Sequence, residues 1–209
     1  MDLLSQLAMK HQTDKGPQHH NYTPRYFEIL KGLKNSPLIL LEIGVGGYHF
    51  PDRGGGSLRM WEEFFPKAHI HGIDIYDKSP LNKGRVHTHI ASQTHEQQLI
   101  NLINVIGSPD VIIDDGSHIS SDIIFAFEIL FPRLKKGGIY IVEDTETSYW
   151  KDHFFGSTDI DNLHVETSMN YFKRLTDSLN SDKFDYSGPK FNIESINFYK
   201  GFLVINKTK

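Results

Sequence analysis

Apolar runs of strand length alternate with amphipathic segments of helix length along most of this chain. The strand-like runs cover residues 38–44, 69–75, 85–90, 110–115 and 138–144. The segments with helical spacing between them cover residues 58–65, 94–106 and 120–134. Such an alternation is typical of a parallel sheet with helices on both faces. The sequence therefore predicts an α/β fold.

Capping residues and prolines indicate where the outer helices begin and end. A short helix is expected at residues 2–10, and a second helix opens at Thr23 as N-cap with Pro24 at its first position. This second helix should run to about residue 35. Because Pro132 lies in the last turn of the 120–134 segment, that helix should end or kink there.

The C-terminal part of the chain has a different pattern. Residues 162–179 have helical spacing, and a polar loop follows them. Two strand-like runs at residues 195–200 and 202–207 are joined through Gly201. We expect them to form an antiparallel hairpin at the edge of the parallel sheet.

The composition excludes several classes of protein. The 22 Lys and Arg residues are scattered and outnumbered by 26 acidic residues, so nucleic acid is not an expected partner. The longest apolar run is far shorter than the ~20 residues of a membrane-spanning helix, and no signal peptide precedes the first helix. The absence of Cys excludes disulfides and thiolate metal sites. We expect a cytoplasmic protein with a small-molecule ligand.

A glycine-rich loop follows the first strand of the core, in the segment LLEIGVGGY. Glu42 ends the strand, and Gly44, Gly46 and Gly47 let the backbone approach a ligand closely. In open α/β sheets, ligands bind beyond the carboxyl ends of the strands, so this loop is a candidate binding site. A plain glycine turn is the alternative. His49 occupies the position of the third glycine of an NAD-binding fingerprint, which breaks that pattern.

Asp74 ends the next strand and is a second candidate for ligand binding. Its carboxylate could accept hydrogen bonds from both ribose hydroxyls of a nucleoside, or it could simply cap a turn or a helix. Between the two strands, three glycines precede Ser57, which is expected as the N-cap of a helix. Backbone N–H groups at that helix start could meet a carboxylate.

Four carboxylates follow the fourth and fifth strands, in the segments IIDDGSH and IVEDTETSYW. Asp114, Asp115, Glu143 and Asp144 should meet at one edge of the sheet, where they repel one another unless a cation lies among them. Oxygen ligands favour Mg²⁺. Because side chains alternate along a strand, only one residue of the Asp114 and Asp115 pair is expected to be a ligand. Helix caps and turn acids are the alternative.

The chain contains 12 histidines, a third kind of residue that could carry chemistry. His118 stands three residues after Asp115 and has an ordinary pKa close enough to neutral for a general base. His87 and His89 alternate with other residues along a predicted strand. We interpret these two as ordinary surface residues unless metal binding shows otherwise.

The motifs taken together resemble a known family. TDKG, EIGVGG, GGGSLRMW, GIDIYDK, IDDGSH and VEDTETSYW occur in this order, and the chain is similar to the macrolide-sugar O-methyltransferases of the mycinamicin and demethylmacrocin type. The resemblance implies a Rossmann-like class I methyltransferase fold with strand order 3-2-1-4-5-7-6 and S-adenosylmethionine and Mg²⁺ as cofactors. It implies Asp115, Glu143 and Asp144 as metal ligands, His118 as general base, and Glu42, Gly44, Gly46, Ser57, Asp74, Ser92, Gln93 and Asp114 as cofactor-binding residues.

The resemblance also implies a domain organisation and an acceptor class. We expect one methyltransferase domain over residues 1–209, with N-terminal helices (1–36), a cofactor and metal core (37–147), an acceptor lid (148–192) and a C-terminal hairpin (193–209). The acceptor is expected to be a sugar-like diol, on a sugar or a glycosylated natural product. The family's macrolide enzymes have an additional N-terminal domain, for which these 209 residues leave no room, and a homo-oligomer is left open.

Two other classes of function compete with methyl transfer. One is a metal-dependent oxidoreductase or hydrolase on the same fold, of the cephalosporin hydroxylase-like type. The other is a binding module that has kept the cofactor fold without turnover. The joint presence of Asp115, His118, Glu143 and Asp144 speaks against the second of these.

Overall fold

Seven strands form a mostly parallel sheet in the order β3-β2-β1-β4-β5-β7-β6, which confirms the expected topology. The computed structural model describes residues 1–159, 162 and 164–209; residues 160, 161 and 163 of the expected lid and C-terminal helix lie outside them. The chain divides into two compact units, residues 1–92 and 93–209, which are described separately. One domain over residues 1–209 stays a prediction. None of the described helices has the length and apolar character needed to cross a membrane.

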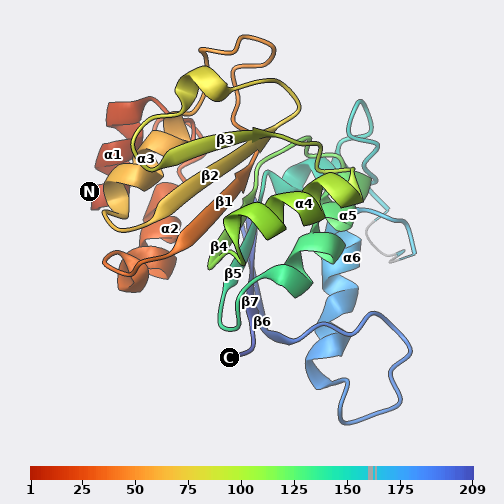
Figure 1. Cartoon of the computed structure of the whole chain (residues 1–209). Helices are drawn as coiled ribbons and strands as arrows, with labels where there is room; N and C mark the ends of the chain where they lie inside the picture. Colours follow the sequence, from red (N-terminus) through yellow and green to blue (C-terminus); the bar gives the residue numbers. More distant parts are fainter. Residues whose placement is uncertain (160–161, 163) are drawn as a thin grey trace. The chain divides into compact units, whose positions relative to one another are not determined.

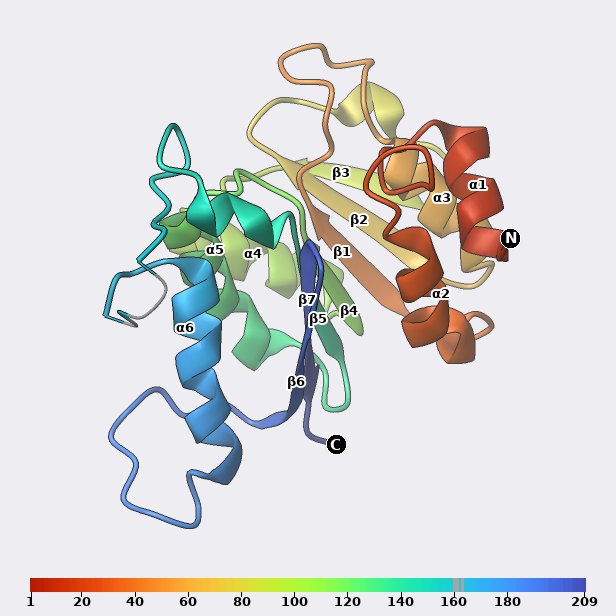
Figure 2. The ribbon, with the colours of Figure 1, turned by 180° about the vertical axis from the view of Figure 1, so that it is seen from behind.

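The first unit contains three parallel strands and three helices. Its elements are α1 (Leu3–His11), α2 (Thr23–Leu30) with a 3₁₀ turn (Lys31–Leu33), β1 (Ile39–Ile43), α3 (Gly56–Phe64), β2 (His69–Asp74), a 3₁₀ turn (Ser79–Leu81) and β3 (Val86–Ile90). β2 pairs in parallel with both β1 and β3. Opposite views of this unit show α1, α2 and α3 on one face of its strands (Figures 1 and 2).

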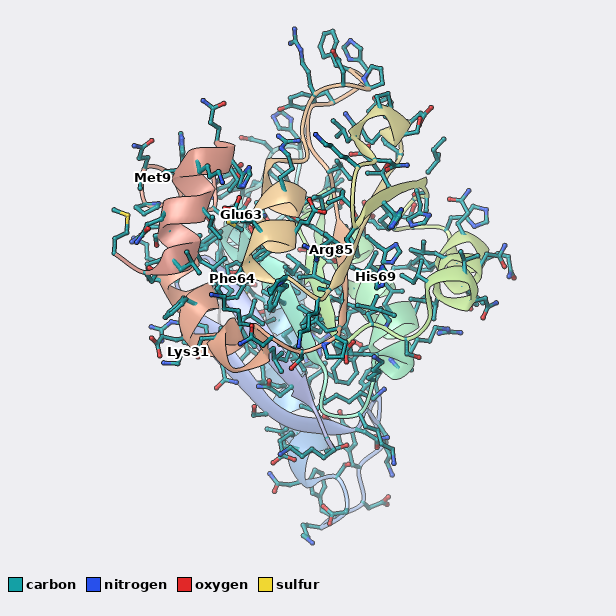
Figure 3. The ribbon with its side chains drawn as sticks, turned by 60° about the vertical axis from the view of Figure 1, so that its left-hand side comes forward. Met9, Lys31, Glu63, Phe64, His69 and Arg85 are labelled. Carbon is teal, nitrogen blue, oxygen red and sulfur yellow. The ribbon has the colours of Figure 1, made fainter. Side chains whose placement is uncertain are left out.

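Helix α3 fixes the packing of this unit. Its inner side buries Trp61 and Phe64 completely. On its other side, Glu63 binds Lys10 at 2.7 Å and His11 at 2.8 Å, both at the end of α1 (Figure 3). Apolar burial provides most of the stability of such a contact, because exposed ion pairs contribute little.

Arg85 closes the C-terminal end of α3, where helix carbonyl groups have no partner within the helix. Its guanidinium donates to the backbone oxygens of Phe65 and Ala68, each at 2.7 Å, and of Glu62 at 2.6 Å. Figure 3 shows Arg85 close to this helix. The planar group therefore ties the start of β3 to the turn between α3 and β2.

The second unit contains four strands and three helices. Its elements are α4 (Glu96–Ile106), β4 (Val111–Asp114), α5 (Ser120–Leu130) with a 3₁₀ turn (Phe131–Arg133), β5 (Ile139–Glu143), a 3₁₀ turn (Thr145–Tyr149), α6 (Ser168–Arg174) with a 3₁₀ turn (Leu175–Asn180), β6 (Ile193–Tyr199) and β7 (Phe202–Lys207). β4 and β5 are parallel, whereas β7 pairs antiparallel with β5 and β6, as expected of the C-terminal hairpin (Figure 2). Phe127 of α5 is fully buried and contacts the rings of Phe131, Tyr140 and Phe172.

Helix starts are the main difference from the sequence prediction. The N-cap of α2 is Tyr22, and the Thr23 hydroxyl instead lies 2.9 Å from the Ser5 hydroxyl. The N-cap of α3 is Gly55 in the left-handed conformation, so Ser57 lies inside the first turn. Both expected N-caps were therefore wrong, because local sequence does not reveal which hydroxyl has a tertiary partner.

Two further helix boundaries test the proline and capping arguments. The predicted helix at 162–179 begins only at Ser168, where the Thr167 side chain accepts from the N–H of Asn170, and it becomes a 3₁₀ turn at Leu175. The end of α5 before Pro132 is confirmed, since the chain continues there as a 3₁₀ turn.

Lys207 closes the end of α5 as Arg85 closes α3. Its side chain is 9% exposed, and its ammonium donates to the backbone oxygens of Phe131 (3.1 Å), Pro132 (2.7 Å) and Leu134 (2.7 Å). All three N–H groups of the ammonium are engaged in this way. The last strand of the chain is thereby tied to the turn between α5 and β5.

We expect Lys207→Met to lower the free energy of unfolding by about 2 to 3 kcal/mol, because three buried carbonyl groups lose a charged donor. Urea denaturation followed by circular dichroism measures this difference. Lys136→Met, at an exposed position of the same region, is the matched control and should change the stability by less than about 0.5 kcal/mol. Equal stability of the two variants would contradict the capping role.

Candidate functional site

The loop after β1 folds back tightly on itself. A Cβ atom at Gly47 would collide with the backbone of Arg53, and one at Gly54 would collide with the carbonyl oxygens of Val45 and Gly46. Both glycines also have positive φ angles, of 78° and 92°. Only glycine fits this close approach.

Gly46 differs from these two, because it has open space on the side where a Cβ would lie. Its φ of 74° and that of Gly44, 90°, lie in the region that favours glycine. The backbone of Gly46 is therefore uncovered on that side. The loop thus has one packed side and one open side.

Glu42 is the last residue but one of β1 and is fully buried. Its Oε2 accepts a hydrogen bond from the Trp61 indole at 2.9 Å, and its Oε1 lies 3.4 Å from the Lys15 ammonium. Lys15 is itself only 1% exposed. A buried carboxylate requires such partners, and this one joins β1 to α3 and to the TDKG segment.

Asp74 connects the loops that follow β1 and β2. Its Oδ2 accepts from the N–H of Val45 at 3.2 Å, and its Oδ1 accepts from the N–H of Tyr76 at 3.0 Å. The turn role and the ligand role weighed for this residue are compatible, because a carboxylate has about four acceptor positions.

Lys78 holds the tip of the glycine loop. Its side chain is 1% exposed, and its ammonium donates to the backbone oxygens of Tyr48 (2.6 Å), Phe50 (2.8 Å) and Arg53 (3.2 Å). These carbonyl groups belong to no helix or strand. We interpret Lys78 as the anchor that keeps residues 48–53 in a single conformation.

Three ionisable side chains meet in the second unit, after the ends of β4 and β5. Nε2 of His118 lies 3.9 Å from Oδ1 of Asp115 and 3.7 Å from Oδ2 of Asp144. One ligand atom from each residue lies within 4.8 Å of the others, as a shared metal ion requires. The three side chains are 19–24% exposed, so solvent and small ligands can reach them.

Glu143, the third expected metal ligand, is the last residue of β5 and is 2% exposed. It is not part of this group of three, in which His118 takes the third place. Its role as a ligand stays a prediction.

The backbone at this cluster is strained. His118 and Asp144 have φ angles of 58° and 51°, in the left-handed region that side chains other than glycine rarely adopt. The buried Thr147 hydroxyl lies 2.9 Å from the carbonyl oxygens of both residues. Such strain persists only where the surroundings enforce it, and it is concentrated at functional sites. Thr147 enforces it here.

Asp114 lies beside the cluster but has a different environment. It is 1% exposed, and its carboxylate accepts from the N–H of Gly116 at 3.4 Å and from the Tyr140 hydroxyl at 3.3 Å. Burial raises the pKa of Asp114 to about 7, and the neighbouring Asp115 adds to the shift. Of the two, only Asp115 is in the three-residue group, and its role as the metal ligand stays a prediction.

Gln93 is a buried amide with one side satisfied by the protein. Its Oε1 accepts from the N–H of Ser117 at 2.8 Å. Its Nε2 is buried and has no hydrogen-bond partner among the described residues. A buried donor without a partner is costly, and it is a common sign of a missing ligand or water. Ser92 precedes it in the same loop.

Aromatic side chains of the expected lid lie near His118. The Phe154 ring is 6.5 Å from the His118 ring and packs edge-on against Trp150 at 5.5 Å. Trp150 is half exposed and Phe155 is three-quarters exposed. Their accessibility fits the expected apolar surface, although a lid over residues 148–192 stays a prediction.

The sequence argument found the strand-end acids, His118 and the glycines, but it missed three residues that hold them in place. Lys15, Lys78 and Thr147 are all buried. Lys15 and Lys78 fall inside the quoted motifs TDKG and GIDIYDK, which was the only signal available for them. Thr147 likewise falls inside the quoted motif VEDTETSYW, and nothing in the sequence marked its contacts with the backbone of His118 and Asp144.

The curated proteins to which this chain is similar are O-methyltransferases. No protein-family model matches the chain. An 8-demethyl-8-alpha-L-rhamnosyl tetracenomycin-C 2'-O-methyltransferase of Streptomyces olivaceus is 44% identical over 87% of this chain and 47% of its own length. The mycinamicin VI 2''-O-methyltransferase of Micromonospora griseorubida is 40% identical over 84% of this chain and 44% of its own. The chain thus spans about half the length of these curated relatives.

Solved structures to which this chain is similar include a methyltransferase as well. The MycE methyltransferase from the mycinamycin biosynthetic pathway, in complex with Mg, SAH and mycinamycin VI, has a TM-score of 0.89 and 37% identity. The match covers 99% of this chain and 54% of that one. A second crystal form of MycE with Mg and SAH has a TM-score of 0.91.

We expect Lys78→Met to release the loop at residues 48–53, because three carbonyl groups lose their common donor. The free energy of unfolding should fall by about 2 kcal/mol, and hydrogen–deuterium exchange should accelerate mainly over residues 44–55. Lys83→Met, at an exposed position nearby, is the control. Unchanged exchange in this loop would disprove the anchoring role, whatever the effect on stability.

Proposed function

Because this chain is a homologue of the sugar O-methyltransferases and has their class I methyltransferase fold, we propose that it methylates a hydroxyl of a sugar on a small glycosylated molecule. The proposed methyl donor is S-adenosylmethionine and the proposed metal is Mg²⁺. The observation that carries the proposal is the grouping of Asp115, His118 and Asp144 after the ends of β4 and β5. Two carboxylates and a base are what metal-assisted methylation of an alcohol requires.

The residues of the first unit fit the methyl donor. Gly46 leaves backbone open on one side, and Asp74 has acceptor positions left for ribose hydroxyls. Glu42 is engaged with Trp61 and Lys15, so its contribution would be to hold the loop in place. The unsatisfied Nε2 of Gln93, which opens the second unit, suits a ring-nitrogen acceptor such as adenine provides. The proposed donor site consists of Glu42, Gly44, Gly46, Ser57, Asp74, Ser92, Gln93 and Asp114.

The residues of the second unit fit a hard divalent cation. Asp115 and Asp144 offer carboxylate oxygens, which Mg²⁺ prefers over nitrogen. We retain Glu143 as a proposed third ligand. When bound, Mg²⁺ would lower the pKa of an acceptor hydroxyl and orient it together with a neighbouring oxygen of the sugar.

His118 would accept the proton of the acceptor hydroxyl at Nε2, the atom that faces both aspartates. The acceptor oxygen forms a bond to the methyl carbon, and the carbon–sulfur electron pair returns to sulfur. Because the sulfonium is already activated, the protein contributes positioning, charge and the base.

The competing functions have less support. The named curated relatives compared above are O-methyltransferases, which favours methyl transfer over a metal-dependent oxidoreductase or hydrolase. The strain at His118 and Asp144 favours an active site over a simple binding module. A homo-oligomer and a cytoplasmic location are further proposals.

The first prediction from this proposal concerns binding. Calorimetric titration with S-adenosylhomocysteine should give micromolar affinity in wild-type protein, and a separate Mg²⁺ titration should give a signal that Asp115→Ala abolishes. In Asp115→Ala, S-adenosylhomocysteine should still bind, since Asp115 is not in the donor site. Absence of S-adenosylhomocysteine binding with Mg²⁺ and with EDTA would overturn the methyltransferase proposal.

The second prediction concerns turnover. His118→Ala should reduce transfer of a labelled methyl group to a rhamnosylated polyketide by about 100-fold or more, as expected for loss of a general base. The affinity for S-adenosylhomocysteine should stay within about twofold. His19→Ala, at an exposed position in the loop between α1 and α2, is the control. Methyl transfer at the wild-type rate in His118→Ala would remove the role assigned to this residue.

A further inference from the structure

Two His-X-His sequences lie on neighbouring strands of the first unit. His69 and His71 are two residues apart on β2, as are His87 and His89 on β3. Side chains alternate between the faces of a strand, so each pair lies on one face. The parallel register places His71 opposite His87, which brings both pairs to the same face. Figure 3 shows His69, where β2 begins.

Three imidazoles of this histidine cluster (His69, His71, His87 and His89) are in contact, those of His71, His87 and His89. Nδ1 of His71 lies 3.0 Å from Nε2 of His89. The His71 ring stacks against two other rings of the cluster. Its centroid lies 5.5 Å from that of His87 and 5.3 Å from that of His89, with interplanar angles of 28° and 29°. The nitrogens of His71 and His89 are therefore close enough to share one ligand, and the His87 ring stacks beside them.

The cluster lies on the face of β2 that points away from α3. The neighbouring Gly72 packs against Leu58 of α3, and the alternation of the strand turns His71 to the other side. His69 and His87 are exposed, whereas His71 and His89 are half-buried. An ion from solvent can therefore reach the cluster through its exposed members.

The pKa shifts of His71 and His89 favour the neutral imidazole. Burial lowers the pKa of His71 to about 4, and the other three imidazoles lower it further through repulsion. Burial also lowers the pKa of His89. Neutral imidazole, with a free lone pair, is the form that binds metals. His71 and His89 are therefore neutral imidazoles near pH 7, the form that a metal ion requires.

We infer that the histidine cluster is a binding site for a late first-row divalent cation of the Zn²⁺, Ni²⁺ and Cu²⁺ class. Imidazole nitrogens select these ions over Mg²⁺. Two nitrogens that bind one Zn²⁺ at about 2.0–2.1 Å lie roughly 3 Å apart, close to the 3.0 Å separation of the His71 and His89 nitrogens. His87 is the third ligand, and His69 supports the site at its exposed end.

This site is separate from the proposed Mg²⁺ site and does not depend on methyl transfer. None of its four residues belongs to the proposed donor site or to the group of Asp115, His118 and Asp144. The two sites differ in chemistry, because one offers nitrogen ligands and the other mainly oxygen ligands. A metal titration can therefore test each of them alone.

Zn²⁺ titration in the presence of saturating Mg²⁺ tests the inference. The wild-type chain should bind one equivalent at the cluster, and His71→Asn should weaken this binding by at least about tenfold, since even loss of an outer-shell partner has that effect. His164→Asn, an exposed histidine outside the cluster, should bind as wild type. Circular dichroism checks the fold of each variant, and His87→Asn, an exposed ligand, replaces His71→Asn if the latter does not fold.

Two further measurements separate the sites. Zn²⁺ binding at the cluster should persist in Asp115→Ala, in which the proposed Mg²⁺ site is lost. With Cu²⁺, electron paramagnetic resonance should show at least two nitrogen ligands in Asp115→Ala and fewer in the double variant with His71→Asn. Absence of Zn²⁺ binding in wild type, or equal binding in wild type, His71→Asn and His87→Asn, would reduce the cluster to a hydrogen-bonded pair and overturn the inference.

Discussion

Backbone carbonyl groups that leave a helix or enter a loop need a donor, and in this chain buried or half-buried cationic side chains supply it. Arg85 does so at the end of α3, Lys207 at the end of α5, and Lys78 in the glycine loop. Each cation comes from a segment distant from the carbonyl groups that it binds. The turns that lead into the strands therefore become ordered only when the tertiary structure forms.

The loop residues that could touch a ligand depend on this scaffold. Gly46 keeps its open side because Gly47 and Gly54 allow the loop to fold back, and Lys78 then holds the loop tip. In the second unit, Thr147 serves the same purpose, because it binds the carbonyl groups of the two strained residues His118 and Asp144. In both places a buried donor preserves a conformation that the local sequence alone disfavours.

The sequence was sufficient for the features that follow from periodicity. Apolar runs predicted all seven strands, and acids at the ends of β4 and β5 predicted that Asp115 and Asp144 would meet. It was insufficient where a polar side chain could choose between local and distant partners. Thr23 could cap its own helix but binds Ser5, and Ser57 yields the cap position to Gly55 because left-handed geometry is needed there.

The sequence also predicted the roles of some charged residues and not of others. Acidic residues at strand ends are visible in a sequence, whereas the burial of Lys15 and Lys78 depends on the packing of segments distant in the chain. His87 and His89 were interpreted as surface residues. This holds for the exposed His87 but not for His89, which is half-buried and bonded to His71, because the register of β2 and β3 decides which histidines meet.

The full engagement of the Lys78 ammonium has a chemical consequence. An amine reacts with acylating reagents only through a free lone pair, and a nitrogen whose three N–H groups bind carbonyl oxygens does not expose one. Acylation of Lys78 thus requires the glycine loop to open first, whereas exposed lysines react directly. The rate at which Lys78 is labelled therefore reports how fast the loop opens. A ligand that holds the loop closed would lower this rate.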